Sequence, residues 1–163
     1  MFYKLALLLI VGLPLLLLGA GQYGMLQGQA PQDLGVTDGR LKLPSLSRNS
    51  VSSQASLYPD HPQRVHAQIE PLPLKASGAP ASISALARVL SQLQGVTVVE
   101  QRSDYLRAEA QTRWLKFVDD LEFWIDPARG VIELRSASRM GQEDLGANRA
   151  RIEAIRTAYL AAP

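Results

Sequence analysis

Two carboxylates, Asp120 and Glu122, are spaced so that they could act together, because they lie two positions apart in the stretch VDDLEFWID. In a β-strand, residues at that spacing point to the same face of the sheet. Such a pair could bind Mg²⁺ or Ca²⁺, which take oxygen ligands, or could work as a general acid and base. Arg135 and Arg139 follow in the next strand-like stretch and could instead neutralise both acids as ion pairs across the strands. The proximity of these arginines favours the ion pairs over a metal site.

Two serines, Ser136 and Ser138, stand between these arginines in the stretch RSASRMG. A catalytic serine needs a base and an orienting group within hydrogen-bond reach. The two histidines of the chain, His61 and His66, lie far upstream in a proline-rich stretch, and no G-x-S-x-G motif is present. His61 and His66 with Asp60 also form only a weak metal-binding pattern. The sequence therefore predicts neither serine catalysis nor a metal site.

The stretch GQEDLGANR, before the last predicted helix, has side chains suited to a helix start. Asp144 or Asn148 could accept hydrogen bonds from free backbone N–H groups there. With Arg139 and Arg149 beside it, the same helix start could hold an anion. Every helix start needs capping partners, which favours the structural interpretation. Asn148 falls on the apolar stripe of this helix, so we expect its amide to be hydrogen-bonded if it is buried.

Three aromatic residues, Trp114, Phe117 and Trp124, lie just before and within the acidic stretch. They could form a stacking platform for a carbohydrate or a base. Packing in the core and at its rim is the more common use of such side chains, and we favour it here.

The elements that must position these residues can be predicted from hydrophobic periodicity. Four strand-like runs at 96–102, 105–112, 117–126 and 130–139 stand between two helical patterns at 81–95 and 148–162. A further short strand is expected near Val65 to Ile69. Consecutive strands joined by short turns form antiparallel meanders. We therefore predict an α+β domain, in which a curved antiparallel sheet of about five strands is covered on one face by two helices.

The register of the last hairpin can also be predicted. Leu121, Phe123 and Ile125 alternate with polar residues, and a loop over 127–130 would pair Ile125 with Ile132 and Phe123 with Leu134. A shift by one residue would place the two apolar sets on opposite faces. This register sets Glu122 opposite Arg135 on the outer face, with Asp120 and Arg139 nearby.

The N-terminus resembles a secretory signal or a membrane anchor. Lys4 is followed by a Leu-rich run and by no further charged residue before Asp33. Residues 1–21 are therefore expected to be a signal peptide or anchor, 22–33 a linker and 34–163 a single globular domain. We expect a periplasmic protein, or one anchored in the inner membrane through residues 5–21 with its domain on the outer side.

Composition excludes several classes of function. The formal net charge is only +2 among 163 residues, with basic and acidic residues interspersed, so we expect no nucleic-acid partner. There is no cysteine, which excludes disulfides, thiolate metal sites and cysteine catalysis.

Several motifs resemble the family called domain of unknown function 1499. They are DGRL at 38–41, N-x-VSSQA at 49–55, DDLEF at 119–123 and RSASRMGQEDLGANRARIEAIR at 135–156. Members are typically small bacterial proteins, often with a signal or membrane segment, and the family name implies no activity. Many members read CPxSPNCVSS where this chain reads PSLSRNSVSS, so Pro44 and Ser50 replace the family's cysteines and a thiol role is absent here.

The resemblance implies a shared polar set that either binds a ligand or holds the fold. Together with Gly141 and Gly146, the set comprises Asn49, Asp119, Asp120, Glu122, Arg135, Ser136, Ser138, Arg139, Asp144, Asn148 and Arg149. The predicted function is a non-enzymatic envelope domain that binds an unidentified envelope protein or a small anionic ligand. The alternatives are a small hydrolase or metal-assisted enzyme using Asp120 and Glu122 with Arg135 and Arg139, and a purely structural accessory domain. No cofactor is indicated.

Overall fold

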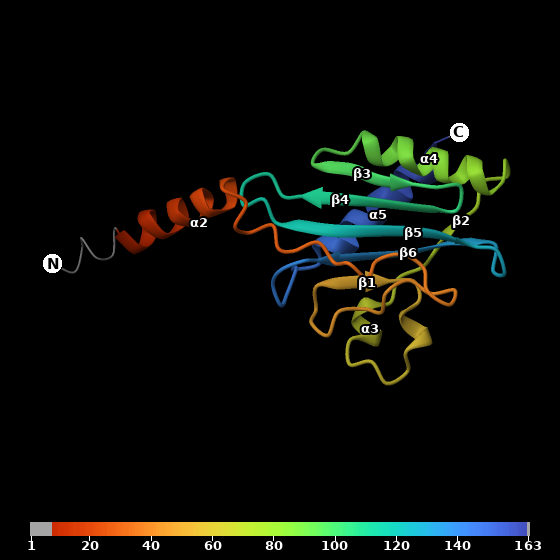
Figure 1. Cartoon of the computed structure of the whole chain (residues 1–163), viewed down its shortest axis with the longest axis horizontal. Coiled ribbons are helices and arrows are strands. Elements are labelled where there is room, and N and C mark those ends of the chain that lie inside the picture. Colours follow the sequence, from red (N-terminus) through yellow and green to blue (C-terminus); the bar gives the residue numbers. More distant parts are fainter. Residues whose placement is uncertain (1–7, 163) are drawn as a thin grey trace.

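The structure, a computed structural model, describes residues 8–162 and has an α+β architecture (Figure 1). Within these residues a six-stranded antiparallel sheet has the order β1-β6-β5-β4-β3, and β2 pairs with β6 at the same edge as β1. The strands are β1 (Ser50–Ser52), β2 (Leu72–Pro73), β3 (Val96–Gln101), β4 (Tyr105–Gln111), β5 (Val118–Asp126) and β6 (Val131–Ser138). The helices are α2 (Leu13–Gln22), α3 (Arg64–Ala67), α4 (Ala79–Ser91) and α5 (Ala147–Ala161), with a π-helical turn at Leu8–Gly12 and a 3₁₀ turn at Ala55–Leu57.

The α+β class, the four long strands and the two covering helices are confirmed, but the strand expected at Val65 to Ile69 is wrong. That stretch holds α3, a single helical turn in which Val65 is exposed. The carbonyl groups of His66 and Gln68 accept hydrogen bonds from the Arg149 guanidinium, at 2.7 and 2.9 Å. A side chain from α5 thus satisfies backbone groups that a strand would have paired with a neighbouring strand. The short strands are instead β1 and β2, on either side of this turn.

The predicted hairpin register is confirmed. Ile125 pairs with Ile132, Phe123 with Leu134, and Glu122 with Arg135. Gly130 closes the loop with a φ of 64°, a left-handed conformation that glycine adopts without steric cost.

One face of the sheet forms the hydrophobic core with α4 and α5. Strands β4, β5 and β6 contribute alternate apolar residues, such as Leu106, Phe123 and Leu134, which are fully buried. The predicted stripe of α5, formed by Asn148, Ile152, Ile155 and Tyr159, is buried against them. Burying these apolar groups is the main favourable term for folding, at about 25 cal/mol per Å².

Helix α2 projects from one end of the sheet (Figure 1). Lys4 and the start of the expected anchor, residues 5–7, lie outside the described residues. Among residues 8–162, no helix is both long enough and apolar enough to cross a membrane. Downstream of α2, residues 28–46, which we call the strap, contact the sheet face opposite α5, for example through Gly35 against Glu122 and Leu43 against Arg135.

Candidate functional site

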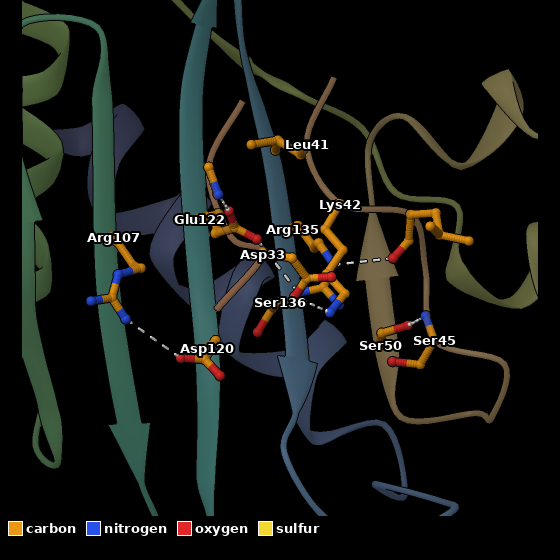
Figure 2. Close-up of polar contacts among 12 residues, drawn as sticks. Asp33, Leu41, Lys42, Ser45, Ser50, Arg107, Asp120, Glu122, Arg135 and Ser136 are labelled. Carbon is orange, nitrogen blue, oxygen red and sulfur yellow. Dashed lines mark hydrogen bonds and ion pairs between the residues drawn. The ribbon is translucent and has the colours of Figure 1, made fainter. Parts of the chain in front are cut away.

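The sheet face beneath the strap is charged and yet buried. On β5 and β6, the outward-facing side chains of Asp120, Glu122, Glu133 and Arg135 are between 0 and 4 % exposed. The strap excludes water from this face, so each charge needs a partner within the protein. Figure 2 shows Glu122, Arg135, Lys42 and Asp33 gathered where the strap passes β5 and β6.

Glu122 is the centre of this polar face. Its Oε1 accepts hydrogen bonds from the backbone N–H of Gly35 at 2.7 Å and from the Tyr105 hydroxyl at 2.9 Å. Its Oε2 lies 3.5 Å from Nη1 of Arg135. Burial, and then the negative charge of Glu122, raises the pKa of Tyr105, so the phenol remains a donor. The carboxylate is therefore fixed by three donors from the strap, β4 and β6.

Arg135 is buried as deeply as its partners but is held less tightly. Its Nε donates to the carbonyl oxygen of Leu43 at 3.4 Å, so within residues 8–162 neither this contact nor that to Glu122 is short. Burial lowers the pKa of Arg135, and the charges of Glu122 and Asp120 only partly offset that effect. A charged guanidinium normally makes contacts near 2.8 Å, so Arg135 retains capacity for another acceptor.

Arg139 contrasts with Arg135, because two of its nitrogens make short hydrogen bonds to carboxylates. Its Nε and Nη2 donate to the two oxygens of Asp120, at 2.8 and 2.7 Å, and Nη2 also reaches Glu109 at 2.5 Å. The hydrogen bond to Asp120 is the largest influence that raises the pKa of Arg139. Arg107 adds a second cation within 3.9 Å of Asp120. The strap passes closely here: a Cβ on Gly28, whose φ is 70°, would lie 2.7 Å from Cβ of Arg139.

A cavity of about 370 Å³ lies between the strap and this part of the sheet. Its lining includes Lys42, Leu43 and Ser45 from the strap, and Asp120, Arg135 and Arg139 from the sheet side. Lys42 pairs with Asp33 at 2.5 Å at the exposed rim. The cavity thus combines three cations and the carboxylate of Asp120 with a wall of apolar strap residues. Each cation faces an acid of the protein, and among the described residues only Arg135 of the three has no contact shorter than 3.4 Å.

A second polar cluster lies on the other side of the sheet, at the start of α5. Asn148 is fully buried, and its Oδ1 accepts hydrogen bonds from the Ser136 hydroxyl at 2.5 Å and from Arg151 at 3.0 Å. Its Nδ2 donates to Ser138 Oγ at 3.0 Å and to the carboxylate of Asp144 at 2.8 Å. The expectation that a buried Asn148 is hydrogen-bonded is therefore confirmed.

Asn49 extends this cluster to β1. Its Nδ2 donates to the carbonyl of Gly141 at 2.7 Å. Its backbone carbonyl oxygen accepts from Nδ2 of Asn148 at 3.1 Å and from the N–H of Ser138 at 3.0 Å. On the other flank, Asp119 accepts from Nη2 of Arg151 at 2.6 Å. These contacts join the residue before β1 with β5, β6 and α5.

Asp144 caps α5, as one of the sequence interpretations predicts. Its carboxylate accepts from the N–H groups of Gly146 and Asn148, both at 2.9 Å. Burial acts to raise the pKa of Asp144, but these hydrogen bonds outweigh it and lower the pKa below its ordinary value. The helix start is therefore occupied by the chain's own carboxylate.

The predicted polar set divides into two clusters separated by the sheet. The outer members are Asp120, Glu122, Arg135 and Arg139, and the inner members are Asn49, Asp119, Ser136, Ser138, Asp144 and Asn148. Arg149 belongs to neither, since it binds the carbonyl groups around α3. Of the two clusters, the outer one borders the 370 Å³ cavity with most of its charges.

Sequence reasoning missed several members of both clusters. Tyr105, Arg107 and Glu109 alternate with Leu106 and other apolar residues along β4, so their period of two could have placed them on the outer face. The partner of Asp119 is Arg151, on α5, and no local sequence pattern predicts this contact. Near the start of β6, the buried Glu133 accepts a hydrogen bond from Ser53 at 2.5 Å and pairs with Arg129, whose side chain is half-exposed.

The remaining candidates do not assemble into a site. Within the described residues, no three side chains among His, Asp and Glu are arranged to hold a metal ion. Trp114 precedes β5, whereas Trp124 lies near its other end, about 20 Å along the strand from Val118 at ~3.3 Å per residue. Trp114 and Trp124 therefore cannot form one stacking platform.

Comparison with known proteins gives one match. A family model described as protein of unknown function (DUF1499) matches residues 40–159, which include both polar clusters. No curated protein matches the chain, and no solved structure matches it.

Proposed function

Because this chain belongs to the DUF1499 family, whose function is unknown, we propose a function from the geometry of its polar face. The protein is an exported or membrane-anchored envelope protein whose domain binds a small anionic ligand without catalysing a reaction. The ligand carries a carboxylate or phosphate group and enters the cavity between the strap and the sheet.

The main support for this proposal is that Arg135 is buried and has only long contacts. Its guanidinium is buried, has contacts of 3.4 and 3.5 Å, and lines the cavity of about 370 Å³. An arginine fork matches a carboxylate or phosphate with two parallel hydrogen bonds. A bound anion would supply the short contacts that Glu122 and Leu43 do not provide.

The enzyme alternative receives less support from the same contacts. Asp120 is held in the fork of Arg139, and Glu122 is held by Gly35, Tyr105 and Arg135. A general acid or base must reach the proton that it transfers. Both carboxylates are directed at donors of the protein, an arrangement that favours binding over proton transfer.

The location of the protein is proposed from the N-terminal segment. Leu8, Ile10 and Leu16 are each at least 67 % exposed, and most of the residues around them in this segment are apolar as well. Exposed apolar surface of this extent is favourable next to lipid and unfavourable in water. We place the domain on the outer side of the inner membrane, in the periplasm.

Ligand binding can be tested by thermal unfolding with acetate, succinate and phosphate at millimolar concentration. An anion at a hundredfold its Kd stabilises the fold by about 2.7 kcal/mol, which raises the Tm of a chain of this size by roughly 5–10 °C. Arg135→Lys should abolish the shift because lysine lacks the fork, whereas Arg88→Lys, exposed on α4, should keep it. If no anion raises the Tm, or if Arg135→Lys responds like the parent protein, the binding proposal is wrong.

Export can be tested separately with a fusion of residues 1–35 to alkaline phosphatase, which is active only outside the cytoplasm. We expect an active fusion. An expressed but inactive fusion would contradict the proposed location.

A further inference from the structure

The loop between β4 and β5 lies at the end of the sheet from which α2 departs (Figure 1). It reads Thr-Arg-Trp-Leu-Lys-Phe over residues 112–117, and Trp114 in it is 63 % exposed. The neighbouring turn before α5 exposes Met140 and Leu145, which line one small cavity together with Thr112 and Phe117. Three large apolar side chains therefore lie exposed on adjacent loops at one end of the domain.

Helix α2 is seated directly on this loop. Nε2 of Gln22 donates to the carbonyl of Trp114 at 3.0 Å. Gly21 is buried, and a Cβ on it would lie 2.5 Å from the carbonyl oxygen of Leu115. The close approach requires a glycine at this position, so the end of α2 has a fixed place on the domain.

The apolar surface continues without a break from the loop onto the helix. A groove of about 750 Å³ is lined by Trp114 and Leu115 and by residues of the N-terminal helical segment, including Leu9, Leu13 and Leu17. Any apolar phase that surrounds α2 therefore also reaches the 112–117 loop.

The charges of the loop suit a membrane interface. Arg113 and Lys116 flank the apolar pair, and the loop contains no acidic residue. The turn that carries Met140 and Leu145 holds two acids, but Glu143 pairs with Arg48 at 3.6 Å and Asp144 accepts backbone N–H groups at the start of α5. The Arg113 guanidinium lies 4.9 Å from the centre of the Trp114 ring. Tryptophan favours the headgroup level of a bilayer, and juxtamembrane Lys and Arg are attracted by anionic lipids.

We propose that the 112–117 loop, with Met140 and Leu145, is a second membrane contact that docks the domain onto an anionic bilayer. The inference rests on the proposed function, because it takes residues 5–21 as a retained anchor. The loop lies at headgroup level, and α2 continues from it into the apolar layer. β5 then leads away from the bilayer, and Trp124 lies about 20 Å further out along the strand.

The two tryptophans allow a direct test with the full chain in vesicles of phosphatidylcholine and phosphatidylglycerol that carry brominated acyl chains. Bromine quenches a tryptophan that lies at or below the headgroups. The Trp124→Phe protein reports Trp114, and we expect strong quenching. The Trp114→Phe protein reports Trp124 and is the matched control, in which we expect no quenching.

Charge variants sharpen this test. Replacing Arg113 and Lys116 together with glutamine should reduce the quenching of Trp114 in anionic vesicles. Arg88→Gln, an exposed substitution on α4, should leave it unchanged.

Flotation of the same vesicles separates the two levels of the proposal. Protein that floats with the vesicles but shows equal, weak quenching of both tryptophans would overturn the docking of the loop and leave the anchor intact. Protein that does not float would overturn the anchor and the loop contact together. Protection of Trp114 that depends on the protein-to-lipid ratio would indicate contact between copies of the chain and would also overturn the lipid contact.

Discussion

At β5 and β6, the two faces of the central sheet are both buried, but by opposite chemistry. Phe123 and Glu122 are neighbours on β5, and both are fully buried. Phe123 packs beneath the helices, in the apolar core. Glu122 lies beneath the strap, among Gly35, Tyr105 and Arg135.

This difference determines how each face responds to change. Apolar burial is non-directional and roughly proportional to area, so the helix-covered face should lose stability in proportion to the carbon removed. A buried ion pair is different, because removal of one partner leaves a charge without compensation. The polar face should therefore lose much of its stability when one partner of an ion pair is removed, and should regain most of it when both partners are removed.

Glu122→Leu should have the largest effect. It leaves Arg135 buried without its counter-ion and removes the acceptor of Gly35 and Tyr105, which should cost about 3–5 kcal/mol of the free energy of unfolding. Urea unfolding measures this loss. Glu153→Leu, at a half-exposed position on α5, is the control and should change stability by no more than about 0.5 kcal/mol.

The double variant Glu122→Leu with Arg135→Met tests the reason for this loss. Because both charges are gone, most of the stability should return. A double variant as unstable as the single one would show that packing, or the lost acceptor of Gly35 and Tyr105, outweighs the unpaired charge on the polar face.

Ile132→Val should have an intermediate effect on the apolar face. It removes one methylene from a fully buried side chain, which costs about 0.5–1.5 kcal/mol. Val65→Ala removes more carbon but from an exposed position on α3, and it should be nearly neutral. A cost for Ile132→Val as large as that for Glu122→Leu would remove the contrast between the faces.

The apolar face could be predicted largely from the sequence, because its information is local. Alternation in 121–125 and 132–136 gives the register of β5 and β6, and the spacing of Ile152, Ile155 and Tyr159 gives the buried stripe of α5. The prediction failed at Val65 to Ile69, where Arg149 supplies the hydrogen bonds from far along the chain.

The polar face could be predicted only in part, because its partners are distant. The pairing of Glu122 with Arg135 follows from the register. The contact of Gly35 with Glu122 spans 87 residues, and that of Leu43 with Arg135 spans 92. Residues 28–46 are turn-rich and have no periodicity, which is typical of irregular structure wrapped on a domain but does not indicate which surface it covers. The cavity that they enclose could not be predicted for the same reason.

The rim of the polar face should respond least, and Lys42→Ala tests it. The Lys42 and Asp33 side chains are 29 and 68 % exposed, so water screens their pair and its loss should cost about 0.2–1 kcal/mol. The hydrogen bond from Lys42 is the main influence that lowers the pKa of Asp33 below 3.8. The pair therefore stabilises the fold fully above that pH and loses its effect as pH falls through the lower, folded-state pKa.

The stability difference between the parent protein and Lys42→Ala, measured by urea unfolding, should thus be largest near neutral pH and low salt. It should shrink in acid and in concentrated salt. A difference that persists under both conditions would mean that Lys42 acts through the packing of its aliphatic stem on the cavity wall, and the rim would then belong with the buried part of this face.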